Sequence, residues 1–402
     1  MFQGIPDRFK MAKMEWLEAA HKQTDSHPYS FTRAGVAYLR KSELRLNQAR
    51  FPRIAVQFVE VDGSQGEGGG QILRTAVAFS AIQHRPVRVS KIRAGRGVPG
   101  LKRQHVSALL VLAQVFGGEL SGATEGSSTV TFVPGAPRLS VLSVDMGTAA
   151  SITLVLQAVV PAVAFAGSRL ELGLIGGTDV PWSPTLDYLQ HVVRDAYAFA
   201  GIRFEVTASR RGYYPRGGGR VKALIEPSRS LSPLDLTTRG EVPVATLLSR
   251  CGRLPRNVAE RQLSSASKVL EDSGVRVLKS EVSEEQTDSP GSSLLIYYTG
   301  GNTFLGSDAL GAKGRPAEEV GRAAAANFVS VCKSEACIDS NLADMLLPLL
   351  SLGPDQSRVR IPEVTAHLRS GLQLAEQFTS CTWTSETRGG SAIVVITPKR
   401  NG

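Results

Sequence analysis

The sequence predicts an α/β protein with a smaller α/β domain inserted into a larger core. Three observations lead to this prediction. The order strand, small-residue turn, helix occurs twice in the first 236 residues. Residues 227–233 are rich in serine, proline and arginine, which is typical of a linker. A block with its own strand and helix pattern follows, and the final stretch is expected to return to the main body.

The first half of the chain contains two similar series of elements. In the first series, alternating apolar residues (Ile54, Val56, Phe58) predict a strand after Pro52, and a glycine-rich loop over 62–70 leads into a helix. The series continues with a helix face over 72–80, a basic strand over 87–92 and a helix over 104–116. The second series comprises a strand over 141–145, a turn over 147–149, a helix over 151–166, a strand over 169–174, a helix over 186–200 and a strand over 203–208.

The second half predicts the insertion and the return to the core. Residues 242–248, 275–280 and 294–298 have strand patterns, residues 259–270 have a helix pattern, and 281–293 is expected to be a polar, acidic loop. An apolar helix over 342–350, a strand, a helix after His367 and a last strand over 392–397 complete the chain. The predicted divisions are a basic N-terminal extension (1–53), a core (54–236), the inserted domain (237–336) and the returning core segment (337–402).

The charge balance favours a polyanionic partner. The 402 residues contain 46 Lys and Arg against 36 Asp and Glu, and residues 85–103 contain seven basic residues and no acid. A composition of 42% hydrophobic and 20% charged residues is that of a globular protein. The most apolar stretch, 149–166, is interrupted by polar residues, so no membrane partner is expected. Four cysteines and no apparent secretory signal suggest reduced thiols in the cytoplasm, or in the nucleus of a eukaryote.

The glycine-rich loop could bind phosphate. A strand, clustered glycines and a helix N-terminus present free backbone N–H groups and a helix dipole to an anion. The spacing fits neither the Walker A nor the dinucleotide fingerprint, so a plain tight turn is an equal alternative. Glu67 within the loop would repel phosphate unless a metal ion lay between them.

Two further segments suggest chemistry. The basic residues of 91–96 and 100–105 could converge on one anion because glycines and Pro99 hold them in loops, although a solvated basic loop is an equal alternative. His367 could attack a phosphorus centre as a neutral imidazole, although a single histidine is more often structural. Gln157 lies amid an apolar helix, where its amide must either join elements or contact a ligand.

Five segments together resemble the RNA 3'-terminal phosphate cyclase family, in the same order from Val56 to the C-terminus. They are 62–74, 92–105, 176–182, 211–219 and the region of His367. The resemblance implies repeated βαβαββ units, with helices packed on four-stranded sheets, and a smaller inserted α/β domain. It also implies an ATP-dependent enzyme that needs Mg²⁺ or Mn²⁺. Such an enzyme forms a covalent histidine–AMP, transfers AMP to an RNA 3'-phosphate, and closes a 2',3'-cyclic phosphate as the 2'-hydroxyl displaces AMP.

The same resemblance implies roles for individual residues. His367 falls on the nucleophile, and Glu67 on a carboxylate near the triphosphate and metal. The ATP-binding positions are Glu67, Arg74, Gln157, Asn341, Leu342, Ala343, Asp344 and Met345. The positions that handle phosphate and the RNA end are Arg93, Arg96, Gln104 and His105.

Two other functions compete with the cyclase. One branch of the family lacks the histidine and serves ribosome assembly, so a non-catalytic RNA-processing factor is the main alternative, and His367 argues against it. An enolpyruvyl transferase would share the repeated architecture, but its motifs are absent. Asn341, Met345 and Ser370 differ from the residues usual in the family.

Overall fold

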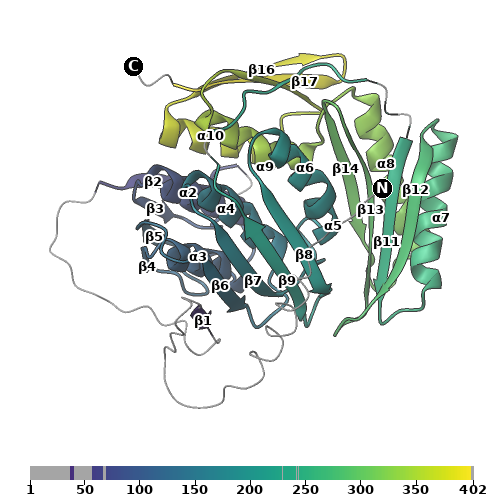
Figure 1. Cartoon of the computed structure of the whole chain (residues 1–402), viewed down its shortest axis with the longest axis horizontal. Helices are drawn as coiled ribbons and strands as arrows, with labels where there is room; N and C mark the ends of the chain where they lie inside the picture. Colours follow the sequence, from purple (N-terminus) through teal and green to yellow (C-terminus); the bar gives the residue numbers. More distant parts are fainter. Residues whose placement is uncertain are drawn as a thin grey trace, which may run out of the picture.

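The computed structural model describes residues 57–66, 69–228, 230–240, 242 and 244–399, together with a short strand, β1 (Ala37–Leu39). Three units of the same design and one insertion make up this part of the chain (Figure 1). The α/β class and the repeated units predicted from the sequence are therefore confirmed. Within the described residues, no helix has the length and apolar character that crossing a membrane requires.

Each of the three units pairs its four strands in the same order. The first consists of β2 (Val59–Asp62), α2 (Gly70–Gln83), β3 (Val87–Ser90), α3 (Arg103–Val115), β4 (Glu119–Ser121) and β5 (Val130–Val133). Its sheet has the order β2-β3-β5-β4, with β2 parallel to β3 and the remaining pairs antiparallel. This is the arrangement that a βαβαββ sequence of elements gives.

The second unit repeats the arrangement with longer strands. It consists of β6 (Val141–Asp145), α4 (Ile152–Phe165), β7 (Leu170–Gly176), a second helical segment, β8 (Phe204–Arg210) and β9 (Gly219–Ile225). The helical segment begins as α5 (Leu186–Tyr188), passes through a π-helical turn (Leu189–Val193) and ends as α6 (Arg194–Phe199). The sheet order is β6-β7-β9-β8, and β1 extends it beside β6.

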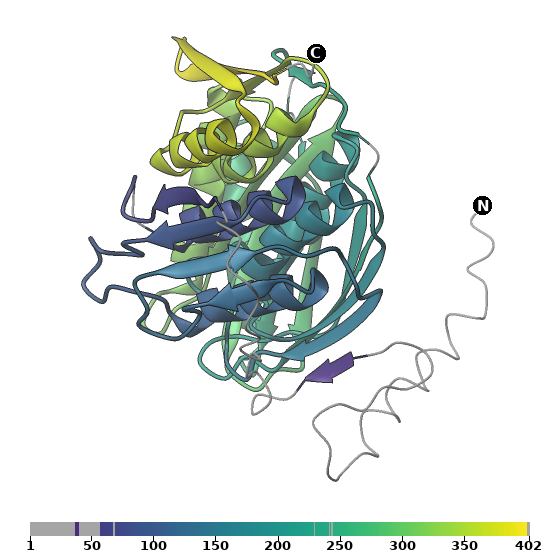
Figure 2. The same cartoon turned by 90° about the vertical axis from the view of Figure 1, so that its left-hand side faces the viewer.

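The third unit is split by the insertion. Its strands are β10 (Asp235–Leu236), β15 (Ser357–Ile361), β16 (Thr382–Arg388) and β17 (Ser391–Thr397), in the order β10-β15-β17-β16. Helix α10 (Ala366–Thr379) follows β15, whereas α9 (Ser340–Leu346) and a 3-10 helix (Leu347–Leu352) precede it. Figure 2 shows the C-terminal part of this unit, in yellow, lying over the first unit. Helices α2, α4 and α10 pack side by side, and one apolar core joins the three units.

The insertion has its own sheet, with two helices on one face. It consists of β11 (Val244–Gly252), α7 (Asn257–Asp272), β12 (Arg276–Glu285), β13 (Gly291–Gly300), β14 (Thr303–Leu310) and α8 (Ala317–Lys333). Alternate strand residues point to opposite faces of a sheet. Accordingly Leu247 and Leu294 pack in a second core under α7 and α8, whereas their neighbours Leu248 and Leu295 join the main core. The boundaries predicted for the domains remain predictions.

The acidic loop predicted over 281–293 is wrong in its extent. Strand β12 continues to Glu285 and β13 begins at Gly291. Arg250 on the neighbouring strand binds the polar end of β12, because its guanidinium bonds to Ser283 at 2.7 Å and Glu285 at 3.0 Å, and most other residues of β12 are exposed. The sequence pattern also missed β1, β4, β5, β9, β10, β14, β16 and α8. The basic extension predicted over 1–53, apart from β1, and the start of the first predicted strand lie outside the described residues.

Candidate active site

A cavity of about 740 Å³ lies where the three units and the insertion meet. The N-terminal turns of α2, α3 and α10 line it through Gly70, His105 and His367. Helix N-termini carry partial positive charge and unpaired N–H groups. Three of them around one cavity give it a positive field that favours a phosphate group.

The glycine-rich loop brings the first of these turns beside the third. Gly66 has φ of 56°, a left-handed conformation that glycine adopts without strain. A Cβ at Gly66 would lie 2.2 Å from Oγ of Ser370 in α10, so only glycine fits there. The loop therefore packs against the helix that carries His367. Asp62 at its start is engaged by Lys91 at 2.8 Å and Ser64 at 2.6 Å, and these hydrogen bonds lower its pKa to about 2.

Arg74, on α2, is a half-buried cation that lines the cavity. Burial lowers its pKa to about 10, so it keeps its charge at neutral pH. Among the described residues, no carboxylate forms an ion pair or hydrogen bond with it. A cation withdrawn from water without an acidic partner is costly. Arg74 is therefore suited to an anion that enters the cavity.

The basic loop over 91–100 folds around one of its own arginines. Arg93 has φ of 55°, is only 9% exposed, and donates from Nη1 to the carbonyls of Val98 at 2.9 Å and Gly100 at 3.2 Å. Burial and the charge of Arg96 both lower the pKa of Arg93. Because Arg93 and Arg96 both line the cavity, the loop is not merely a solvated basic surface.

His105 is buried beside these cations as a neutral imidazole. Burial, then the charges of Arg74, Arg93 and Lys102, lowers its pKa to about 3. Its Nδ1 accepts the backbone N–H of Lys102 at 3.1 Å, so the proton is on Nε2. A Cβ at Gly70 would lie 2.1 Å from this Nε2, which places the imidazole against the first turn of α2. His105 is thus a hydrogen-bond donor that adds no charge.

His367 is the second residue of α10, and a hydrogen-bonded cap fixes that end of the helix. The Thr365 hydroxyl accepts the N–H of Leu368 at 2.9 Å and donates to Oδ1 of Asp344 at 2.6 Å. Asp344 therefore orients the turn that carries His367. Gln71 on α2 lies within 3.5 Å of the His367 carbonyl, and its side chain also lines the cavity.

The opposite wall of the cavity is mainly apolar. Helix α4 contributes Leu154, Ala158 and Pro161 around Gln157, and α9 with its 3-10 extension contributes Met345 and Leu349. Such a wall, with the amides of Gln157 and Asn341 among aliphatic groups, suits a flat heterocycle that also forms hydrogen bonds. The cavity thus joins a cationic half to an apolar half, with His367 among its lining residues.

The structure brings together ten of the residues singled out in the sequence. These cavity-lining residues are Arg74, Arg93, Arg96, Gln104, His105, Gln157, Asn341, Asp344, Met345 and His367. Leu342 and Ala343 are buried in the main core and do not line the cavity, and their part in ATP binding stays a prediction. Glu67 lies outside the described residues. Within the described part, no three His, Cys, Asp or Glu side chains are grouped to hold a metal ion.

Sequence reasoning missed Asp308, which reaches the cavity from the inserted domain. It lies on β14, and its Oδ2 accepts the N–H of Thr185 at 2.6 Å. Burial raises its pKa. No local pattern marks this residue, because its position depends on how the insertion packs on the second unit.

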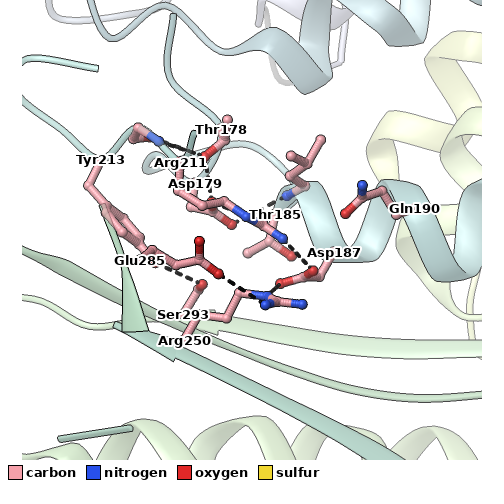
Figure 3. A network of polar contacts seen from close by, with 12 residues as sticks. Thr178, Asp179, Thr185, Asp187, Gln190, Arg211, Tyr213, Arg250, Glu285 and Ser293 are labelled. Carbon is pink, nitrogen blue, oxygen red and sulfur yellow. Dashed lines mark hydrogen bonds and ion pairs between the residues drawn. The ribbon is translucent and has the colours of Figure 1, made fainter. Parts of the chain in front are cut away.

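A buried ionic network lies beside the cavity and joins the same two parts (Figure 3). Asp187 accepts from Arg211 at 2.6 Å and from Arg250 of the insertion at 2.7 Å, and Arg211 also contacts Asp179 at 3.3 Å. Burial would raise the pKa of Asp187, but the charges of Arg211 and Arg250 outweigh this effect and lower it. The network accounts for two of the segments, 176–182 and 211–219, for which the sequence analysis assigned no role.

Comparison with known proteins agrees with this architecture. Residues 65–384 match the family described as RNA 3'-terminal phosphate cyclase. This chain belongs to that family. The matched region includes every residue that lines the cavity. The resemblance inferred from the sequence motifs is therefore confirmed.

Curated relatives carry the same description. A protein named RNA 3'-terminal phosphate cyclase from Pyrococcus furiosus is 43% identical over 319 residues, which cover 79% of this chain and 92% of the relative. A protein of the same name from Hyperthermus butylicus is 42% identical over 80% of this chain and 91% of its own length. Another, from Thermococcus gammatolerans, is 40% identical over 85% of this chain and 98% of its own length. Residues 1–64 of this chain precede the region that matches the family.

Proposed function

We propose that this protein converts the 3'-terminal phosphate of an RNA into a 2',3'-cyclic phosphate in an ATP-dependent reaction. The observation that carries the proposal is the grouping of three helix N-termini around one cavity with His367 and with Arg74, which has no acidic partner among the described residues. The family name of the relatives supports the RNA end as substrate.

The first step is attack by the His367 imidazole on the α-phosphorus of ATP. A nitrogen–phosphorus bond forms, the bond to the β-phosphate oxygen breaks, and pyrophosphate leaves. The apolar wall with Gln157 receives the adenine, while Arg74 and the helix N-termini balance the phosphate charge. The Asp344–Thr365 hydrogen bond holds the histidine turn in place for this attack.

In the second step, an oxygen of the RNA 3'-phosphate displaces His367 from the AMP phosphorus. The neighbouring 2'-hydroxyl then attacks the RNA phosphorus, loses its proton, and expels AMP. Because the hydroxyl is already adjacent, ring closure benefits from a high effective concentration. The proposal assigns contact with the RNA phosphate to Arg93, Arg96 and the Nε2–H of His105, all of which line the cavity.

The proposed reaction also includes a divalent ion, which would be bound mainly by the phosphates of the substrate. Mg²⁺ typically binds through substrate phosphates and one or two carboxylates, so it needs no cluster of three protein ligands. Asp344 and Asp308 are the carboxylates that line the cavity in the described residues, and Glu67 is a further candidate. When bound, the ion would neutralise phosphate charge.

The test uses three oligonucleotides with ATP and either Mg²⁺ or Mn²⁺. An RNA with a 3'-phosphate should become resistant to phosphatase, whereas one with a 3'-hydroxyl should not react. A DNA 3'-phosphate, which lacks the 2'-hydroxyl, should accept AMP without cyclising. His367→Ala should abolish all products. His84→Asn, at an exposed helix end outside the cavity, should leave them unchanged. A folded wild-type protein that binds RNA but makes no product would favour the non-catalytic assembly factor.

A further inference from the structure

Trp182 is the most unusual residue of the cavity. It is 95% exposed, the highest value among the exposed large apolar side chains of the described residues. The others are Val98, Phe199, Tyr214 and Leu278, and none of them lines the cavity, whereas Trp182 does. An indole left in water at the edge of a cationic cavity is an informative exception to the burial of apolar groups.

The backbone at Trp182 is held in an unfavourable conformation. Its φ of 68° lies in the left-handed region, which side chains other than glycine and asparagine adopt rarely. Such conformations persist only where the surrounding structure fixes them, and they concentrate at functional sites. The contacts on either side of Trp182 must therefore hold its backbone in this conformation.

Hydrogen bonds fix the chain closely on both sides of Trp182. Ser183 donates to the Val180 carbonyl at 2.8 Å, and Thr153 on α4 donates to the Pro184 carbonyl at 2.9 Å. The Thr185 N–H is bound by Asp308, and Asp179 belongs to the buried ionic network (Figure 3). The segment is therefore rigid, while the one bulky side chain at its centre lies in solvent. This arrangement presents a flat aromatic surface already in position.

A nucleobase is the ligand that such a surface fits. Exposed aromatic rings beside cationic side chains are the usual means of binding single-stranded nucleic acid, since every base offers a face for stacking. The adenine of ATP and the terminal base of RNA share this chemistry. The enclosed apolar wall around Gln157 suits adenine, whereas an indole 95% exposed lies on the rim, where a polymer leaves the cavity. The position therefore favours RNA.

We propose that Trp182 stacks on the 3'-terminal nucleobase of the RNA and so aligns its phosphate with the cations of the cavity. This inference rests on the proposed cyclase function. It assigns Trp182 a part in substrate binding and none in the chemistry at His367.

The kinetic test measures each half of the reaction separately. Trp182→Gly removes the ring and relieves the left-handed backbone, Trp182→Ala removes the ring alone, and Trp182→Phe keeps an aromatic surface. For Gly and Ala we expect the KM for RNA to rise between about 5-fold and 150-fold, the range given by base stacking on aromatic side chains. Formation of histidine–AMP without RNA should stay within about twofold. Phe should recover most of the loss, and Leu278→Ala, an exposed apolar residue outside the cavity, should behave as wild type.

A fluorescence test needs no turnover. The chain has three tryptophans, so the emission of wild type minus that of Trp182→Phe isolates Trp182. A 3'-phosphorylated RNA without ATP should quench this emission, and ATP without RNA should not. Quenching by ATP alone with an unchanged KM for RNA would overturn the proposal in favour of adenine. A cyclising wild type whose Trp182 emission neither ligand changes would overturn it altogether. Quenching by RNA in a wild type that forms neither histidine–AMP nor product would support the base contact while refuting the cyclase function.

Discussion

Replacement of Arg74 by methionine should stabilise the folded protein while impairing the cavity. Burial lowers the pKa of Arg74 from 12.5 to about 10. Since one pKa unit corresponds to about 1.4 kcal/mol, keeping the guanidinium charged in the folded protein costs at most about 3 kcal/mol, because Arg74 as a whole is only half-buried. At pH 7 Arg74 is protonated in both folded and unfolded chains, so the full cost is present; it would diminish only above about pH 10. Methionine has a similar length and no charge, so the free energy of unfolding should rise by up to about 3 kcal/mol.

Urea denaturation at pH 7 measures this change, and thermal unfolding with inorganic pyrophosphate measures the function. Pyrophosphate that binds the folded cavity should raise the Tm of the wild type and have little effect on Arg74→Met. Arg88→Met is the matched control, because Arg88 is an exposed arginine paired with Glu60 at 2.7 Å. Its unfolding free energy should change by less than about 1 kcal/mol. The reasoning is refuted if Arg74→Met destabilises the protein and pyrophosphate still stabilises the variant as much as the wild type.

Three other changes test individual parts of the site. His105 has a pKa of about 3 in the folded protein against 6.5 when unfolded, so the free energy of unfolding falls as pH drops below 6.5, by about 2 kcal/mol at pH 5. His105→Asn should therefore reduce the fall in urea midpoint between pH 7 and 5. An unchanged pH profile would contradict the buried neutral imidazole. Asp344→Ala should slow histidine–AMP formation about tenfold, and the lost bond to Thr365 should lower the unfolding free energy by about 1 kcal/mol. Equal adenylylation by the variant and the wild type would show that the Asp344 bond does not orient His367. Asp187→Asn leaves two arginines without their shared acid and should lower the unfolding free energy by about 3–5 kcal/mol; a loss below about 1 kcal/mol would mean that the network does not hold the insertion to the core.

Local patterns predicted the fold class and most of the longer elements. The predicted helix over 151–166 and strand over 141–145 agree with α4 and β6 to within about one residue. The longest helix, α8, and several strands, among them β9 and β14, were missed. Other elements were cut short where their pattern reflects tertiary contacts. The end of strand β12 is the clearest example: it was predicted as a loop, whereas Arg250 of the neighbouring strand binds its Ser283 and Glu285.

The candidate site was predictable only as separate residues. Motifs singled out Arg74, His105 and His367, which stand far apart in the chain, and the resemblance to a known family supplied their roles. The neutral state of His105 could not be predicted, since it depends on burial and on three cations from different segments. Asp308 and the orienting bond from Thr365 to Asp344 also depend on packing between units.

The most direct test of the central claim is transfer of AMP to His367. Wild-type protein should be incubated with ATP labelled at the α-phosphate, and either Mg²⁺ or Mn²⁺, and then separated by denaturing electrophoresis. We expect the wild-type protein to carry a label that is labile in acid and stable in alkali, and that is removed by RNA with a 3'-phosphate. The label should be absent from His367→Ala and present on His84→Asn. Labelled His367→Ala protein would contradict the assignment of the nucleophile. Folded wild-type protein that stays unlabelled with both metals would contradict the nucleotidyl-transfer account.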